Sequence, residues 1–229
     1  MISSLFICTL LCMLFLLFRR LYAKHRSAIF NPLLLCIIVI STWLLTFDVN
    51  YHEFFQAAQP IHFFLEVAVV ALAYPLYSQF RSIKHYFLPL VACSFAGVTS
   101  ATLVAFLLCR LYTTDAQLSA SLAALSVTTP ITLLISESLG GMSAIAAIMV
   151  ILVGIFGGIF GVTILTQLNV VHPQAKGIAL GVSCHAIGTA SALEYHPAAG
   201  AYASAAMTIS AVVTAVWVPP FYRWLTMLL

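Results

Sequence analysis

The chain has 229 residues, of which 63% are hydrophobic and only 7% are charged, and its formal net charge is +3. A soluble protein carries about 25% charged residues, and about 20 apolar residues are enough to cross a bilayer. The composition therefore excludes a soluble protein and predicts an all-α, polytopic integral membrane protein, with the lipid bilayer as a partner and no nucleic acid.

The apolar segments predict about seven or eight transmembrane or re-entrant helices. They cover about 2–18, 31–47, 61–79, 87–110, 117–138, 143–166, 176–196 and 200–222. We expect one transmembrane domain over 1–229, in which 1–110 supplies scaffold-like spans and 111–229 forms a glycine-rich unit.

Basic residues set the expected orientation of the first spans. The cluster at 19–26 follows the first apolar segment instead of preceding it, which favours a retained span over a cleaved signal peptide. The positive-inside rule places this cluster and Arg81, Lys84 and His85 on the cytoplasmic side, with 48–53 outside. Lys176 and Arg223 would lie outside if every later segment crossed fully, which suggests either that a later segment re-enters or that the orientation is only weakly specified there.

The third segment contains an acidic residue just inside its predicted span. Glu66 is a candidate proton or ion site, because ionisable groups at membrane depth are costly and mark function. Tyr74 and Tyr77 favour the alternative that this part of the segment lies at the membrane interface, where aromatic side chains gather.

The stretch "SVTTPITLLISES" (126–138) is the first polar group of residues inside an apolar segment. Pro130 removes a helical hydrogen bond, and Thr129 is a plausible N-cap before it, so a half-helix is expected to begin near the bilayer midplane. Its free N–H groups would face the interior. A proline kink repaired by threonine hydroxyls is the alternative.

The run "GIFGGIFG" (154–161) places Gly154, Gly158 and Gly161 on one helical face, a spacing that permits close helix packing. The functional alternative is a smooth face along which a transport unit slides.

The stretch "GVSCHAIGTASALE" (181–194) is the second polar group. Gly188 is expected to break the helix, and the pattern from Ser191 to Glu194 resembles the capping box that begins a new one. Paired broken helices point to a transporter's central site, where half-helix N-termini face an anion. An unperturbed histidine gains and loses a proton near neutral pH, so His185 is the expected proton carrier, with Glu194 as a second candidate. Each has a structural alternative: His185 bonded to a backbone carbonyl, and Glu194 capping its half-helix or lying at the interface.

These motifs resemble the LrgB/CidB family of bacterial membrane proteins, especially its YohK-like branch, from about residue 30 to the C-terminus. The matching stretches are "NPLLLCIIVI", "VVALAYPLY", "SVTTPI", the glycine pair 140–141, "GIFGGIFG" and "GVSCHAIGTASALE". The chain departs from the family at Ala124-Leu125, where the family usually has Pro-Lys, at Val67 in place of a proline, and at Cys184 in place of a serine.

The resemblance implies two functions. One is similar to the plastid glycolate/glycerate translocators, whose C-terminal half belongs to this family: a secondary transporter of small monocarboxylates such as glycolate, glycerate or pyruvate. The other is a holin/antiholin-like regulator of murein hydrolases and autolysis. The resemblance also implies a bacterial cytoplasmic (inner) membrane location, a small LrgA/CidA (YohJ-like) partner and a homo-oligomer, a dimer being the simplest.

The residues favour the transporter, because a holin has no need of two broken helices. The expected substrate-binding residues are Ser126, Thr128, Thr129, Pro130, His185, Gly188, Thr189 and Ser191. Coupling to H⁺ or Na⁺ is open, and no other cofactor is expected. The six cysteines form no C-x-x-C pair and no metal-ligand spacing. An intramembrane protease using Ser183 is disfavoured, because Ser183 and His185 point in different directions on a helix.

Overall fold

The computed structural model describes residues 4–25, 30, 32–71, 73–78, 80–113 and 115–228, and these residues form helices and turns without any strand. Four of the described helices are long and apolar enough to cross a membrane: α1, α7, α10 and α12. The all-α class is confirmed, and the helices fit a polytopic membrane protein. The chain divides into two compact units, Met1–Ala71 and Leu72–Leu229, while the functional division expected at residue 110 stays a prediction.

The first unit contains α1 (Ser4–His25), α2 (Pro32–Thr46), α3 (Tyr51–Ala57) and α4 (Gln59–Ala71). The short helix α3 begins at Asn50, whose side chain accepts a hydrogen bond from the His52 N–H. Its last residue is tied to α1, because the Ser4 hydroxyl donates to the Ala57 carbonyl over 2.6 Å. Glu66 lies on α4, but its side chain is outside the described residues.

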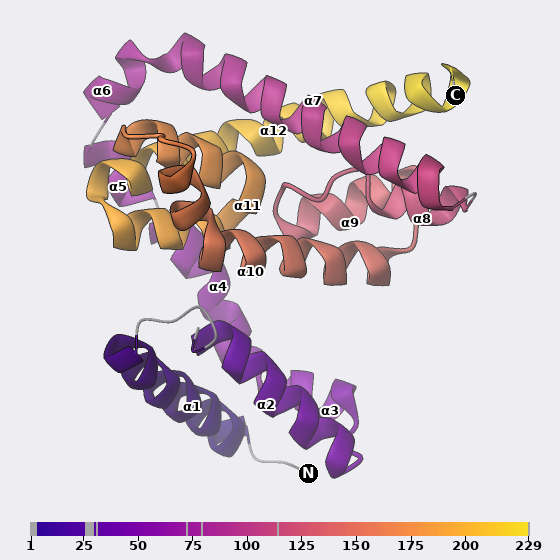
Figure 1. Cartoon of the computed structure of the whole chain (residues 1–229). Coiled ribbons are helices and arrows are strands. Elements are labelled where there is room, and N and C mark those ends of the chain that lie inside the picture. Colours follow the sequence, from indigo (N-terminus) through magenta and orange to yellow (C-terminus); the bar gives the residue numbers. More distant parts are fainter. Residues whose placement is uncertain are drawn as a thin grey trace. The chain divides into compact units, whose positions relative to one another are not determined.

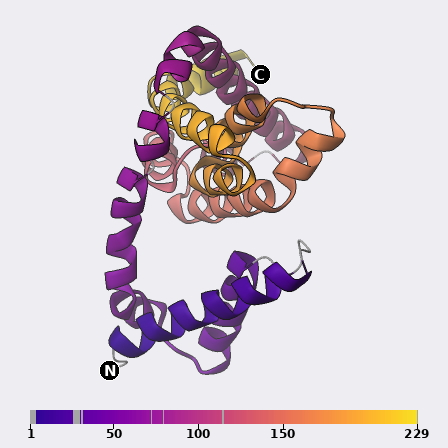
Figure 2. The same ribbon diagram turned by 90° about the vertical axis from the view of Figure 1, so that its left-hand side faces the viewer.

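The second unit carries both predicted polar stretches. Its helices are α5 (Ala73–Ser78), α6 (Phe80–His85), α7 (Phe87–Tyr112), α8 (Ala116–Ser121), α9 (Thr129–Ser138), α10 (Ser143–Gln167), α11 (Pro173–Tyr195) and α12 (Pro197–Leu228). Helices α8 and α9 lie between α7 and α10 (Figure 1). The turned view shows the same helices gathered into one bundle, with α7 and α12 adjacent (Figure 2).

Helices α7 and α12 run side by side in the same direction. Near their first turns, the rings of Tyr86 and Tyr202 lie 6.4 Å apart. Further along, the Trp217 indole donates to the Thr99 hydroxyl over 3.0 Å. Near their last turns, the rings of Phe106 and Tyr222 meet edge to face at 5.6 Å. These successive contacts give the unit two ends, a first-turn end and a last-turn end.

Residues 116–138 fold back on themselves, and we call them the first hairpin. Asp115 begins α8 by accepting from the N–H groups of residues 117 and 118. The returning helix α9 lies beside the incoming chain, because the Thr132 hydroxyl donates to the Ala124 carbonyl over 2.8 Å. Tyr222 donates to the Ser119 hydroxyl, so the hairpin opens at the last-turn end of α7 and α12. The predicted span 117–138 is therefore not one continuous helix but folds back on itself.

Helix α11 is also a hairpin, which we call the second hairpin (residues 173–195). The Lys176 ammonium lies 3.3 Å from the Tyr195 hydroxyl and 4.7 Å above its ring. A straight helix would hold residues nineteen positions apart at about 28 Å. At the closed end, a Cβ built on Gly188 would lie 2.6 Å from the Leu180 carbonyl oxygen. The predicted span 176–196 therefore folds back as well.

Candidate functional site

The two hairpins enter the second unit from opposite ends. The first hairpin opens beside Ser119 and Tyr222, at the last-turn end of α7 and α12. The second hairpin opens at the first-turn end of α12, where Gly177 contacts the Ala199 backbone. Each arm of the second hairpin is about 16 Å long, half the thickness of a bilayer core. Such an arm is long enough to reach the middle of a bilayer but not to cross it.

The second unit contains two parts in inverted orientation. Helix α7 is followed by a hairpin that opens at the last-turn end. Helix α10 runs the opposite way, from Met142 beside Ser121 to Thr166 beside Lys176, and is followed by a hairpin that opens at the first-turn end. The pair α7 with the first hairpin and the pair α10 with the second hairpin thus have opposite orientations, as in inverted-repeat transporters.

The tip of the first hairpin carries free hydroxyl groups. Helix α9 begins at Thr129, with Thr128 as its N-cap and Pro130 in its first turn, so the predicted N-cap is one residue too late. Ser126 is buried, whereas Thr128 and Thr129 are half-buried. Within the part of the chain that the structure describes, these three hydroxyls make no hydrogen bond, and Thr128 does not cap the helix with its side chain.

A helix N-terminus with free hydroxyls is suited to an anion. The backbone N–H groups of the first turn have no helical partner, and the helix dipole adds a partial positive charge there. Thr132, which the sequence analysis overlooked, holds this tip in shape because its buried hydroxyl donates to the Ala124 carbonyl. Its position one turn into α9 and its β-branched hydroxyl are the only sequence signals of that role.

The tip of the second hairpin is made by Cys184 and His185. Their backbones leave the helical region, and His185 has φ +42° and ψ −136°. The break therefore lies at these two residues, whereas the sequence had indicated a break at Gly188. Gly188 belongs to the returning arm, where the absence of a side chain lets it approach the Leu180 carbonyl. The glycine was a correct sign of a break but gave its place three residues too late.

The predicted capping box from Ser191 to Glu194 is wrong. The second arm begins directly after His185, and Ser191 lies well inside it, donating to the Gly158 carbonyl of α10 over 2.9 Å. Thr189 is fully buried and donates to the His185 carbonyl over 2.9 Å. Both hydroxyls therefore hold the hairpin in its present form. Glu194 is exposed near the open end of the hairpin, one residue before Tyr195.

His185 is buried against α10. Its Nε2 atom lies 3.0 Å from the Val150 carbonyl oxygen, and the side chain is 5% exposed. Because a carbonyl only accepts, the geometry assigns the hydrogen to Nε2. The Nδ1 atom is then the position at which a proton is gained or lost. The arrangement matches the structural alternative considered for this histidine, and no described hydrogen bond joins it to the tip of the first hairpin.

The two tips share one buried apolar cluster. Val127 from the first tip and Val182, two residues before the break in the second hairpin, both belong to it, together with Val98 of α7 and Ala206 of α12. The tips thus lie on a common core. The hydroxyls of the first tip make no described hydrogen bond, whereas the imidazole of His185 is bonded to the Val150 carbonyl.

The glycines of α10 lie against the second hairpin. A Cβ on Gly154 would meet the His185 ring, one on Gly157 would meet Cys184, and one on Gly158 would meet Ile187. Gly161 faces the Leu180 side chain in the same way. This glycine face is therefore occupied within the chain and is not a surface for a second copy.

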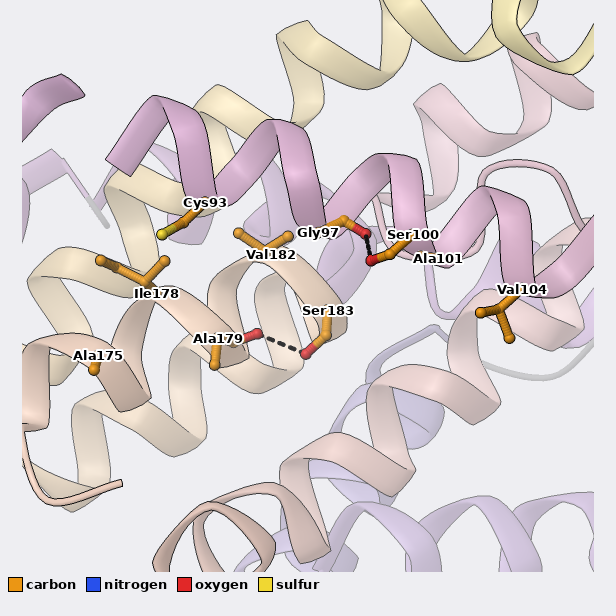
Figure 3. A pocket seen from close by; sticks show the side chains of 10 residues that line it. All are labelled: Cys93, Gly97, Ser100, Ala101, Val104, Ala175, Ile178, Ala179, Val182 and Ser183. Atoms are coloured by element: carbon orange, nitrogen blue, oxygen red, sulfur yellow. Dashed lines mark hydrogen bonds between the residues drawn. The ribbon is translucent and has the colours of Figure 1, made fainter. Parts of the chain in front are cut away.

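A groove of about 540 Å³ lies between α7 and the first arm of α11 (Figure 3). Its lining is mostly apolar, and Val182 approaches Gly97 across it. Two hydroxyls border the groove, but Ser100 donates to the Gly97 carbonyl and Ser183 to the Ala179 carbonyl. The groove therefore offers no free hydroxyl to a carboxylate, and Ser183 has no hydrogen bond to His185 that would activate it as a nucleophile.

Lys176 is a buried charged residue that the sequence analysis used only for orientation. Its side chain is 3% exposed, and its ammonium donates to the Thr166 hydroxyl over 2.7 Å. The hairpin places it at the first-turn end of α7 and α12, the end next to α6 with Arg81 and Lys84, because Ile83, Leu90 and Tyr202 share one cluster. Lys176 therefore lies at the same end as Arg81 and Lys84, so its position agrees with the positive-inside rule.

Comparison with known proteins connects the chain to one family. The sequence model of the LrgB-like family matches residues 9–224. The chain is 34% identical over 200 residues to the antiholin-like protein LrgB of Bacillus cereus, which covers 86% of this chain and 87% of that protein. It is 32% identical over 204 residues to an uncharacterized protein of Haemophilus influenzae, covering 87% of each. No solved structure matches it.

Proposed function

Because the chain belongs to the LrgB-like family, we propose that it is a secondary transporter of small monocarboxylates of the glycolate, glycerate and pyruvate class, and not an enzyme. The observation that carries the proposal is the pair of hairpins that enter from opposite ends and share one core at Val127 and Val182. Broken helices that meet inside the membrane are the usual framework of a transporter's central site. Neither a pore nor a purely structural membrane protein requires them.

The substrate carboxylate would bind at the N-terminus of α9. The free hydroxyls of Ser126, Thr128 and Thr129 would donate to its oxygens, and the unpaired N–H groups of the first turn would complete the site. A small carboxylate suits this site because it presents one negative charge and few atoms. The site lacks the lysine that the family usually carries just before this motif, since Leu125 stands there, so helix and hydroxyl dipoles supply the attraction.

His185 would carry the coupled proton at Nδ1. Its Nε2–H is held by the Val150 carbonyl, so protonation adds a positive charge at the second tip without breaking that hydrogen bond. The added charge would be buried against Gly154 on the face of α10. Movement of the second hairpin along the glycines of α10 would then expose the central site to alternate sides of the membrane. Glu66 and Glu194 remain further candidates for coupling.

We place the protein in the bacterial cytoplasmic membrane, with Arg81 and Lys84 on the cytoplasmic side. The second hairpin then opens to the cytoplasm and the first to the outside. A small LrgA/CidA-type membrane protein and a second copy of the chain are the proposed partners.

The alternative function is regulation of murein hydrolases and autolysis. The name of the Bacillus cereus relative, an antiholin-like protein, favours this alternative over transport. Regulation by lateral association would need an exposed surface, and the glycine face of α10 is covered by α11. Any lateral assembly would therefore use other surfaces. The two functions are compatible, because a flux of carboxylate would itself alter the conditions for autolysis.

Counterflow of radiolabelled glycolate in proteoliposomes tests the transport proposal. We expect Thr129→Val and Thr128→Val each to raise the half-saturating glycolate concentration about tenfold, because each removes a hydrogen bond to an ion. Thr42→Val is the matched control, since the Thr42 hydroxyl donates to its own helix at Ile38 and the residue is exposed. Absence of glycolate, glycerate and pyruvate transport by the wild-type protein would reject the proposal. An autolysis phenotype that survives in Thr129→Val cells would then favour the alternative.

A further inference from the structure

The open end of the second hairpin contains a positive charge buried among neutral groups. The Lys176 ammonium lies 2.7 Å from the Thr166 hydroxyl, 3.3 Å from the Tyr195 hydroxyl and 4.7 Å above the Tyr195 ring. The side chain is 3% exposed. Two hydroxyls and a ring solvate an ammonium but do not neutralise it. Among the described side chains, no carboxylate lies within ion-pair distance of it.

The surroundings of Lys176 add positive potential to this charge. Lys176 lies in the first turn of α11, which begins at Pro173, where the helix dipole is positive and a cation is unfavourable. The first turn of α12 is adjacent, because Gly177 contacts the Ala199 backbone. The nearest acidic residue in sequence, Glu194, is exposed and directed to solvent. An anion close by would therefore stabilise this buried cation beside two helix N-termini.

We propose that Lys176 is the cytoplasmic receiving site for the carboxylate, a second anion site distinct from the tip of the first hairpin. One carboxylate oxygen accepts from the Lys176 ammonium, and the Tyr195 hydroxyl turns to donate to the same anion. The Thr166 hydroxyl donates to the Val162 carbonyl and keeps accepting from Lys176. The site joins α10 to both arms of the second hairpin, so an anion bound there holds the open end of the hairpin against α10. This inference rests on the proposed function for the identity of the anion, but not for the existence of the site.

A phosphate group of an anionic lipid has the same chemistry as a carboxylate at this position. Lys176 is 3% exposed, whereas its partners Thr166 and Tyr195 are exposed residues, so the test has to distinguish a free carboxylate from a lipid phosphate. The reactivity of Lys176 can be measured against that of the other lysines. The chain has only three lysines, and Lys24 and Lys84 are both exposed, so they serve as internal references for the reactivity of the third.

The direct test is acylation of the purified protein by an amine-reactive acetyl ester, followed by mass spectrometry of the lysine-containing peptides. In nanodiscs of neutral lipid, sodium glycolate is expected to slow acylation of Lys176 at least threefold relative to Lys24 and Lys84, while sodium chloride does not. Unchanged ratios with glycolate would overturn the proposal. Slowing by inorganic phosphate alone, or by phosphatidylglycerol with no further effect of glycolate, would also overturn the assignment to the carboxylate.

Transport kinetics distinguish a role of Lys176 in anion binding from a purely structural role. Lys176→Met is expected to raise the half-saturating glycolate concentration on the cytoplasmic side about tenfold, with the maximal rate changed less than about threefold. Lys176→Arg keeps the charge and should restore affinity, and Lys84→Met at the same end is the matched control. A lower maximal rate with unchanged affinity would mean that Lys176 only holds the hairpin in place, and it would overturn the proposal. If the wild-type protein transports no carboxylate, the proposed function fails, and acylation still decides whether Lys176 binds an anion.

Discussion

Gly181→Ala tests the packing of the second hairpin on α12. A Cβ at this position would meet the Ala203 backbone, 2.8 Å from its Cα and carbonyl carbon. Ordinary carbon contacts are about 3.5–4.0 Å, so α11 and α12 would have to separate by roughly 1 Å. Overpacking of this kind costs about 1–3 kcal/mol, and a backbone contact belongs at the upper end. The better helix propensity of alanine offsets about 1 kcal/mol of this cost. The net loss is about 1–2 kcal/mol.

The matched control is Gly161→Ala, in the same unit. There a new Cβ would meet only the end of the Leu180 side chain, which can rotate away. The propensity gain then offsets most of the strain, and the stability should stay within about 0.5 kcal/mol. Thermal unfolding in one detergent, followed by tryptophan fluorescence, compares the two variants with the wild type. Equal stability of Gly181→Ala and Gly161→Ala would refute the close contact between the hairpin and α12.

Three further predictions address the hairpins. A short bismaleimide should link Lys176→Cys to Tyr195→Cys within one chain, identified by mass spectrometry; a straight helix would hold these positions about 28 Å apart, and no link would form. His185→Gly should be more stable than His185→Ala by about 1 kcal/mol in thermal unfolding, because only glycine adopts φ +42° without strain; the reverse order would contradict the break at this residue. Thr132→Val should lose about 1–3 kcal/mol by leaving the buried Ala124 carbonyl unpaired, and Thr132→Ser should lose less; equal losses would show that the hydroxyl is not what matters.

The sequence predicted where the chain is apolar and where helices break, but not the direction that the chain takes after a break. Pro130 gave the start of α9 to within one residue, because proline is favoured in the first turn of a helix. Gly188 gave the second break only approximately, since the break occurs where His185 adopts a positive φ. No local pattern predicts a positive φ at a histidine, because it depends on the Val150 carbonyl 35 positions away.

The roles of single polar residues were the hardest to predict. Ser191 and Thr189 looked like groups available to a substrate, yet each donates to a carbonyl that only the folded chain brings near. Lys176 looked like a loop residue on the wrong side of the membrane. It is buried because the hairpin brings Tyr195 back to it, a contact between residues nineteen positions apart. Sequence reasoning identifies which groups are polar within the membrane, and tertiary contacts decide which of them remain free.

The second hairpin also constrains the order in which the protein is assembled. Neither of its arms is long enough to span a bilayer, so the hairpin cannot be inserted as two independent transmembrane segments. Its first arm is supported on one side by α10 and on the other by Ala199 and Ala203 of α12. Because α12 is synthesised after the hairpin, residues 173–195 reach the ribosome exit before half of their packing surface exists. The hairpin therefore reaches its final packing late in biogenesis, once the last helix is in the membrane.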